Sequence, residues 1–290
     1  MVGFANNGAL VDAETAGRLN RFSFRKVPAV VTAQGTWYDY SMSPGNPAPQ
    51  YYAAAPLTAQ TMTRSGDGGL YHGLDVSPAT KYLRKLMLMC VTAGGVPQQF
   101  TLLDYLMFYP FVDMGTADPQ TLTNVQTLLR YTDGDGVKIM AILVAPHSLV
   151  GDTFFVTYTN QDGVAGRVTP LHTMTNAVSV NGTILTTAQS SAGRIGPFLA
   201  LQAGDTGVRS IESVQCTAGT DVGLFTLVLV KPLANISLRE ITAPVEKDFY
   251  LDEKQLPIIK DDAYLNFIAC PTGSLTGAAL NGTIETIWDN

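Results

Sequence analysis

The stretch Thr153-Phe-Phe-Val-Thr-Tyr-Thr-Asn-Gln-Asp-Gly-Val-Ala-Gly-Arg-Val-Thr-Pro170 places two runs rich in β-branched and aromatic residues on either side of an Asp-Gly pair. Such residues favour strands, and Asp-Gly accepts the positive φ that a tight turn needs. A second turn, Asp133-Gly-Asp-Gly136, lies between Leu128–Tyr131 and Val137–Val144. Both stretches therefore predict β-hairpins.

From Lys81 onward, apolar runs recur at intervals of about 8 to 15 residues and are bounded by turn residues, a pattern typical of a sandwich or barrel. Prolines fall near the ends of these runs, where a sheet tolerates a missing N–H. The sequence predicts a mainly β fold: an antiparallel β-sandwich or jelly-roll-like body over residues 76–290, which could form two lobes at about 76–190 and 191–290. The predicted strands are Tyr82–Thr92, Phe100–Tyr109, Thr127–Thr132, Val137–Ala145, Phe154–Asn160, Ala165–Met174, Gly196–Gln202, Gly207–Thr217, Gly223–Lys231, Ile236–Ile241, Tyr264–Cys270 and Gly282–Trp288.

Residues 1–75 differ from the body because they contain few apolar runs, and Ser43-Pro-Gly-Asn-Pro-Ala-Pro49 suits neither a helix nor a central strand. Asp12–Asn20 is expected to form a short helical element. We interpret residues 1–75 as an extended N-terminal arm. A disordered tail is the alternative, but disordered tails contain few aromatic residues. The arm carries five, which we expect to dock onto the body or a neighbouring subunit as interface residues: Trp37, Tyr38, Tyr40, Tyr51 and Tyr52.

The composition favours an assembly protein. Charged residues make up 14% of the chain, against roughly 25% in an average domain, and obligate interfaces are depleted of charge. The net charge of −6, without a clustered Lys/Arg face, argues against nucleic acid as a partner. No stretch has the pattern of a signal peptide or a membrane span, so we expect synthesis in the host cytoplasm and no membrane contact.

A search for chemistry finds no strong motif. The three histidines, His72, His147 and His172, are scattered and form no zinc-binding pattern. Asp133 and Asp135 resemble the start of a calcium loop, but strand residues follow where the later ligands belong, so a hairpin turn is favoured over a weak calcium site. Asp205-Thr-Gly207 has the tripeptide of aspartic proteases without a second copy. We expect no enzyme, no cofactor and no resident metal.

Several blocks resemble poorly characterised virion structural proteins of tailed bacteriophages and their prophages. They are Asp104–Phe111, Tyr158–Arg167, Gly196–Val214, Asp221–Leu233, Ala243–Glu246 and Asp262–Ser274, so the resemblance covers about residues 81–290. It implies a part of a virus particle and supplies no catalytic residue.

Three functions remain open. The first is a capsid decoration or cement protein that binds the major capsid protein or other virion proteins, bridges neighbouring subunits and forms a homo-oligomer, with a trimer expected. The second is a tail or baseplate component that binds a receptor or glycan through aromatic residues such as Trp37 or Trp288. The third, least favoured, is a hydrolase on a β scaffold.

Overall fold

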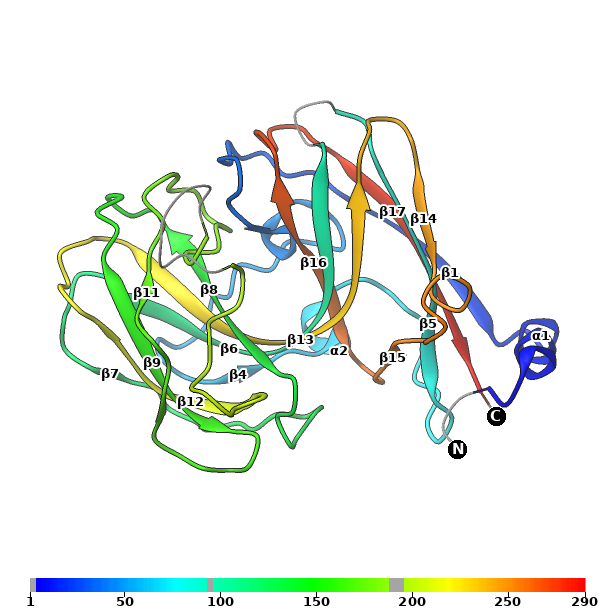
Figure 1. The fold of residues 1–290 in the computed structure, drawn as a ribbon, viewed down its shortest axis with the longest axis horizontal. Coiled ribbons are helices and arrows are strands. Elements are labelled where there is room, and N and C mark those ends of the chain that lie inside the picture. The colour runs from blue at the N-terminus through cyan, green and yellow to red at the C-terminus, as the bar shows by residue number, and fades with distance from the viewer. Residues whose placement is uncertain (1–3, 93–95, 188–195, 290) are drawn as a thin grey trace.

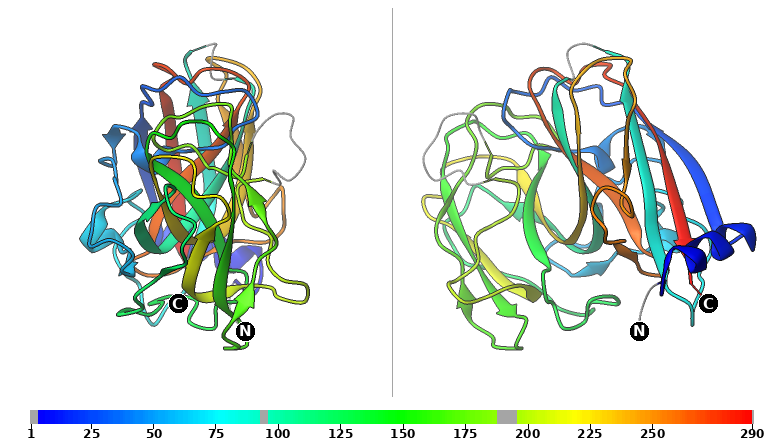
Figure 2. Two further views of the ribbon diagram at one scale, coloured as in Figure 1. Left: turned by 90° about the vertical axis from the view of Figure 1, so that its left-hand side faces the viewer. Right: turned by 45° about the vertical axis from the view of Figure 1, so that its right-hand side comes forward.

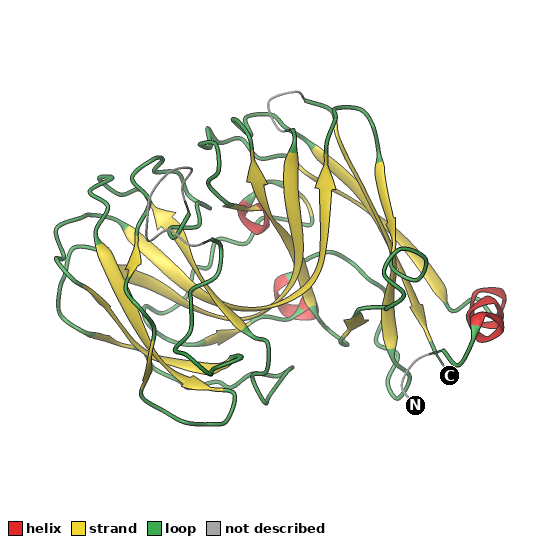
Figure 3. Cartoon of the chain, viewed as in Figure 1, coloured by secondary structure: helices red, strands yellow, loops and turns green. Residues whose placement is uncertain are grey.

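The computed structural model describes residues 4–92, 96–187 and 196–289 and consists mainly of strands (Figure 3). Strands account for 41% of the chain and helices for 6%, and the pairings between named strands are antiparallel, which confirms the predicted fold class. The helical elements are α1 (Asn7–Thr15), η1 (Tyr40–Met42, a 3-10 helix) and α2 (Arg64–Asp67). No helix in the described ranges is both long and apolar enough to cross a membrane.

The strands form three sheets. The terminal sheet contains β1 (Leu19–Lys26), β3 (Gly45–Asn46), β5 (Lys81–Cys90), β14 (Val245–Asp248), β15 (Ile258–Ile259) and β17 (Leu280–Trp288). The shared sheet contains β2 (Tyr38–Asp39), β4 (Gln60–Thr61), β6 (Gln98–Asp113), β8 (Lys138–Ala145), β13 (Leu224–Leu238) and β16 (Tyr264–Pro271). The central sheet contains β7 (Gln120–Thr121), β9 (Thr153–Asn160), β10 (Arg167–Val168), β11 (His172–Thr173) and β12 (Val208–Cys216).

The sheets build two lobes that are joined by the long strands β6 and β13, which run from one lobe into the other (Figure 1). In the central lobe, the shared sheet packs against the central sheet. In the terminal lobe, the shared sheet packs against the terminal sheet. The two lobes stand apart when the molecule is turned by 45° (Figure 2, right).

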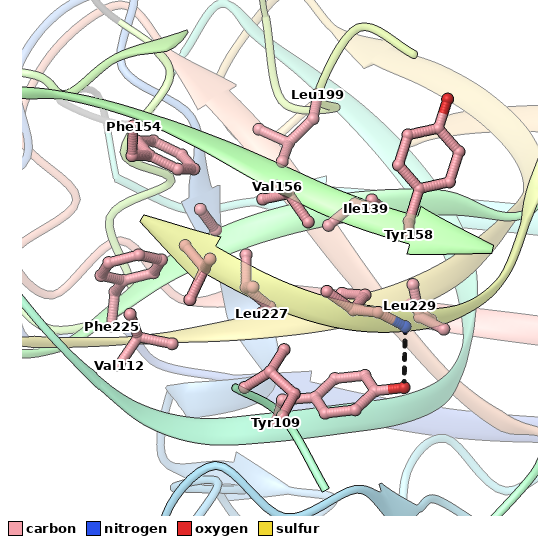
Figure 4. Close-up of a cluster of buried hydrophobic side chains, with 14 of the residues drawn as sticks. Tyr109, Val112, Ile139, Phe154, Val156, Tyr158, Leu199, Phe225, Leu227 and Leu229 are labelled. Atoms are coloured by element: carbon pink, nitrogen blue, oxygen red, sulfur yellow. Dashed lines mark hydrogen bonds between the residues drawn. The ribbon is translucent and has the colours of Figure 1, made fainter. Parts of the chain in front are cut away.

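The core of the central lobe shows why alternating sequences make its strands. Phe154, Val156 and Tyr158 on β9 are buried, while the residues between them are half-buried. They pack toward Phe225 and Leu227 of β13 (Figure 4). Within this core, Tyr109 Oη accepts a hydrogen bond of 3.1 Å from the backbone N–H of Ile211, also drawn in Figure 4. The apolar residues that the sequence marks as strand are thus those that join the two layers.

The terminal lobe depends on the N-terminal strand β1, which lies between β17 and β3 and pairs with β17 along its whole length. Phe24 of β1 stacks on Phe267 of the opposite sheet, with ring centroids 5.4 Å apart. Gly282 lies directly across from Phe24, and a Cβ at that position would overlap the Phe24 ring. The glycine therefore makes room for the aromatic residue that links the sheets.

A bulge lets β13 serve both lobes. Its residues facing the central core are Phe225, Leu227 and Leu229, whereas those facing the terminal core are at even positions, beginning with Ala234 and Ile236. The register with β6 shifts between Pro232 and Ala234, and an extra residue at such a bulge exchanges the side-chain positions on the two faces. Pro232 is tolerated at this irregularity.

The structure places the predicted arm differently. Residues 4–75 are integrated into the body, because β1 completes the terminal sheet, and β2 and β4 pair with β16 and β6. An apolar cluster with Met42, Tyr52 and Met62 includes shared-sheet residues such as Val228 and Val230. The segment has little regular structure but does not extend away from the body.

Other predicted boundaries also change. The cores do not divide the chain at residues 190 and 191, since Ile211 and Phe225 share a core with Phe154. Thr127–Thr132 and Gly196–Gln202 form no strand. The turn at Asp133 therefore joins no hairpin, and β8 pairs with β13 instead. The other predicted hairpin is present, because β9 pairs with β10 across the Asp162-Gly163 turn.

Candidate functional site

The five aromatic residues predicted as an interface do not gather on the surface. Tyr38, Tyr40 and Tyr52 are at most 2% exposed. Trp37 is half-buried and packs against the apolar cluster on the shared sheet, while Tyr51 is 57% exposed. Three of the five therefore face the interior, because the body is large enough to bury them.

The three buried tyrosines lie in or beside a polar network centred on Asp39. Asp39 accepts hydrogen bonds of 2.6 Å from both Tyr52 Oη and Tyr105 Oη. The Ser41 hydroxyl, also 2.6 Å away, and the Ser41 backbone N–H, 2.9 Å away, donate to the same carboxyl. Burial raises the pKa of Asp39, and these hydrogen bonds oppose the rise. The network fixes the N-terminal segment to β6.

Lys26 lies near this network and is also fully buried. Its ammonium group donates to the carbonyl oxygens of Pro47 (3.0 Å) and Ser41 (3.4 Å). Burial lowers the pKa of Lys26 to about 8, and the charge of Asp39 partly offsets this. Because no member of this buried cluster reaches solvent, we assign it to holding the chain together rather than to binding a partner.

His147 and Asp221 form a second buried pair. The His147 Nδ1–Asp221 Oδ2 distance is 3.0 Å, and both side chains are inaccessible. Asp221 Oδ1 accepts from the backbone N–H groups of Ser148 (2.6 Å) and Val222 (2.8 Å). Burial opposes ionisation of Asp221, but these hydrogen bonds and His147 lower its pKa overall. Asp221 therefore ties the segment after β8 to the loop before β13.

The segments that Asp221 holds together expose Leu149, Val150 and Val222, which are 38%, 53% and 57% accessible. We call these three residues the β8–β9 patch. Sequence inspection places His147 in a rim loop and gives no reason to connect it with Asp221, which is 74 positions away. No local motif marks this pair, because the two residues meet only in the fold.

The His147–Asp221 pair resembles part of a catalytic triad, but its surroundings differ from one. Nε2 of His147 has no hydrogen-bond partner among the described residues. The nearby Ser179 hydroxyl instead donates to the backbone carbonyl of His147 (2.8 Å) and accepts from its N–H (2.6 Å). A triad needs a nucleophile on Nε2. The observed contacts orient a loop.

A groove of about 510 Å³ contains Trp288, one of the tryptophans considered for glycan binding. Phe22 and Tyr71 also line the groove, in an edge-to-face contact with centroids 4.5 Å apart. Asn20 and Asp75 add an amide and a carboxylate. Trp37 lies elsewhere, so the two tryptophans do not form one site.

In the turn considered for calcium, the carboxylates of Asp133 and Asp135 already accept hydrogen bonds from other protein groups. Asp133 Oδ1 accepts from the Asp135 N–H (3.2 Å), and Asp135 Oδ1 accepts from the Thr206 hydroxyl (2.8 Å). Within residues 4–92, 96–187 and 196–289, no three His, Cys, Asp or Glu side chains are arranged to hold a metal ion.

No protein-family model matches the chain, and no curated protein matches it in sequence. Among solved structures, the crystal structure of the infectious bursal disease virus VP2 subviral particle has 9% identity and a TM-score of 0.17, covering 94% of this chain and 81% of that one. The D431N mutant VP2 protein of the same virus, in derived T=1 particles, has 8% identity and a TM-score of 0.19, covering 93% and 77%. Similarities this low carry no argument about fold or function.

Proposed function

We propose that this chain is a structural subunit of a virus particle, and more specifically a capsid decoration or cement protein of a tailed phage. It would bind the outside of the head, contact the major capsid protein and bridge neighbouring subunits without catalysing a reaction. The resemblance of residues 81–290 to tailed-phage virion proteins supports this proposal, as does the low charge of the chain.

The observation that carries the proposal is the β8–β9 patch. Three exposed apolar side chains lie on segments that the buried Asp221 carboxylate fixes through backbone hydrogen bonds. A surface ordered before binding loses less entropy when a partner covers it, and such apolar side chains suit the centre of an interface. The contact surface therefore belongs to the body and replaces the N-terminal arm in this role.

The test is binding of purified protein to particles that lack it. We expect Val150→Lys combined with Val222→Lys to reduce occupancy at least tenfold, because each substitution places a charge in an apolar contact. Val11→Lys on α1, which is 59% exposed in the terminal lobe, is the matched control. Unchanged occupancy of the double variant, with an unchanged unfolding curve, would remove the patch as the contact surface.

Two further properties belong to this proposal. We expect a homo-oligomer, with a trimer as the leading assembly, and light scattering of the purified protein measures its mass. We also expect the protein in mature virions, where antibody labelling in negative-stain images separates head from tail. Labelling on the tail would redirect the proposal to a baseplate component.

The groove at Trp288 favours a second candidate function, in which a tail protein binds host glycans. Aromatic rings beside an amide and a carboxylate offer both stacking and hydrogen bonding to sugar rings. Glycan-array binding that is lost in Trp288→Ala and retained in Trp37→Ala would support this function. Equal binding by both variants would exclude the groove.

A further inference from the structure

The strand β13 has an open edge in the terminal lobe. β8 pairs with β13 from Leu224 to Val230, whereas β6 pairs with it as far as Leu238. From Lys231 to Leu238, β6 is therefore the only strand among the described residues that pairs with β13. β14 lies close to this part of β13 without pairing with it, and Lys247 Nζ of β14 donates a hydrogen bond of 2.9 Å to the Asn235 carbonyl. Open strand edges present unpaired backbone groups to which another strand can add.

Two hollows lie along this edge. One, of about 730 Å³, is lined by Lys231, Pro232 and Leu233 of β13 and by Ile258 of β15. The other, of about 520 Å³, is lined by Asn235, Ile236 and Ser237. We call them together the β13 edge groove. Neighbouring β13 residues line the two hollows, so an extended chain that follows β13 would pass both of them.

The β13 edge groove collects cations that have no carboxylate partner. It is lined by four cations that form no ion pair with a described residue: Lys231, Lys254, Lys260 and Arg239. Lys231 and Lys260 place their ammonium groups 5.3 and 5.7 Å from the centre of the Tyr131 ring. A ring contact of this kind orients a cation but leaves its charge uncompensated.

The acidic residues of the same groove already form ion pairs with other lysines. Glu246 pairs with Lys85 at 2.8 Å, and Glu253 pairs with Lys247. The groove is thus electropositive in a chain whose net charge is −6. Apolar side chains, including Leu233 and Leu256, line the larger hollow together with the cations. Acidic residues alternating with apolar ones would satisfy both kinds of surface.

We propose that the β13 edge groove receives an extended acidic segment of a partner protein as an added strand. Addition to a sheet edge takes affinity from main-chain hydrogen bonds and specificity from alternate side chains. A second copy of this edge is disfavoured, because it would bring the same lysines together. That the partner is another virion protein rests on the proposed function, whereas the chemistry of the segment does not.

The probe is a fluorescein-labelled peptide of alternating aspartate and valine, long enough to span residues 231–238. We expect saturable binding by anisotropy that weakens with salt, and at least tenfold weaker binding when asparagine replaces aspartate. N-methylation of alternate backbone amides should abolish binding. Equal binding of the asparagine or N-methylated peptide overturns the proposal.

Matched variants locate the binding site. Lys260→Gln should weaken peptide binding several-fold. Arg25→Gln, which removes from β1 a cation that forms no ion pair with a described residue, should not. Equal losses in both variants would indicate a general charge effect and overturn the assignment. Soluble polygalacturonate is the second ligand to be tested. Binding of this polymer without binding of the peptide would overturn the peptide proposal and indicate an anionic glycan instead.

Particle binding separates this inference from the proposed function. Particle binding without peptide binding would overturn the inference and leave the structural role. Peptide binding without particle binding would keep the groove and remove the virion role.

Discussion

The two lobes are similar in architecture but differ in how the chain builds them. Apart from Ala59, the core residues of the central lobe all come from the continuous stretch between Leu106 and Leu229. The core of the terminal lobe joins residues up to Leu102 with residues from Ala234 onward. The terminal lobe thus requires both ends of the chain to meet, and contacts this distant in sequence are costly to close.

Deletion of residues 1–26 should have the largest effect and should separate the lobes. It removes β1, which pairs with β17 from Leu19 to Lys26, and also removes Phe24 from the core. We expect the amides of β5 and β17 to lose protection in hydrogen exchange while those of β9 and β12 keep it. Deletion of residues 1–5, which ends before the α1 N-cap at Asn6, is the control. Full protection of β17 after the longer deletion would show that β1 is an independent arm.

A buried ion pair in the bend region gives the second prediction. Arg130 Nη2 and Nε donate to the Asp104 carboxylate at 2.7 and 2.9 Å, and Nη2 also reaches the Met62 carbonyl at 3.1 Å. Removing one partner of a buried pair leaves an uncompensated charge, so Asp104→Asn or Arg130→Met should each cost about 3–5 kcal/mol. The double variant should cost clearly less than the sum of the two.

Urea unfolding of the four proteins in this cycle measures the coupling. The surface pair Lys85–Glu246 serves as the control, and Glu246→Gln should cost less than about 1 kcal/mol because this pair is partly exposed. Strict additivity of the Asp104 and Arg130 effects would contradict the role of the pair. Loss of protection in both lobes is expected, since Asp104 lies on β6, a strand that they share.

How much the sequence predicts also differs between the lobes. The central strand β9 alternates regularly and ends in an Asp-Gly turn, so local rules suffice to place it. In the terminal lobe, β1 carries three cations and belongs to the stretch that the sequence suggests is an extended arm. Its burial of Phe24 and Lys26 depends on β17, more than 250 residues later, which no local pattern contains.

Pro232 and the predicted arm illustrate the same limit. Pro232 suggests the end of one strand before Ile236 begins another, whereas β13 continues through it because a bulge removes the need for its N–H. The aromatic residues of the arm suggest docking, and three of them are buried in the body. Sequence cannot distinguish docking within the chain from docking on a neighbour, because both bury the same side chains.

A buried histidine gives the third prediction, a pH effect on the stability of the terminal lobe. Nε2 of His72 lies 3.0 Å from the Ala263 carbonyl, and Lys81 Nζ lies 3.3 Å from Nδ1. Burial and then the charge of Lys81 lower the pKa of His72 to about 3. His72 therefore takes up a proton near pH 6.5 in the unfolded chain but stays neutral at that pH in the folded chain. The free energy of unfolding falls as the pH drops below about 6.5.

Between pH 7 and pH 4 this group should remove roughly 3 kcal/mol from the free energy of unfolding. His72→Gln should flatten this dependence in β5 and β17, as followed by hydrogen exchange. His172→Gln is the comparison in the central lobe, where burial also lowers the histidine pKa. An unchanged acid response of β17 in His72→Gln would assign the effect to other groups.

The smallest predicted effect distinguishes neighbouring tyrosines on the N-terminal segment. Tyr52 Oη lies 2.6 Å from the Asp39 carboxylate and 2.7 Å from the Ser41 hydroxyl, whereas Tyr51 is exposed and its hydroxyl has no hydrogen bond to a described residue. Tyr52→Phe should cost about 1–3 kcal/mol, because it leaves a buried carboxylate without one donor. Tyr51→Phe should change the free energy of unfolding by less than about 0.5 kcal/mol. Equal effects in thermal unfolding would mean that the Asp39 network does not hold this segment, and the N-terminal residues would again be candidates for contact with a neighbouring subunit.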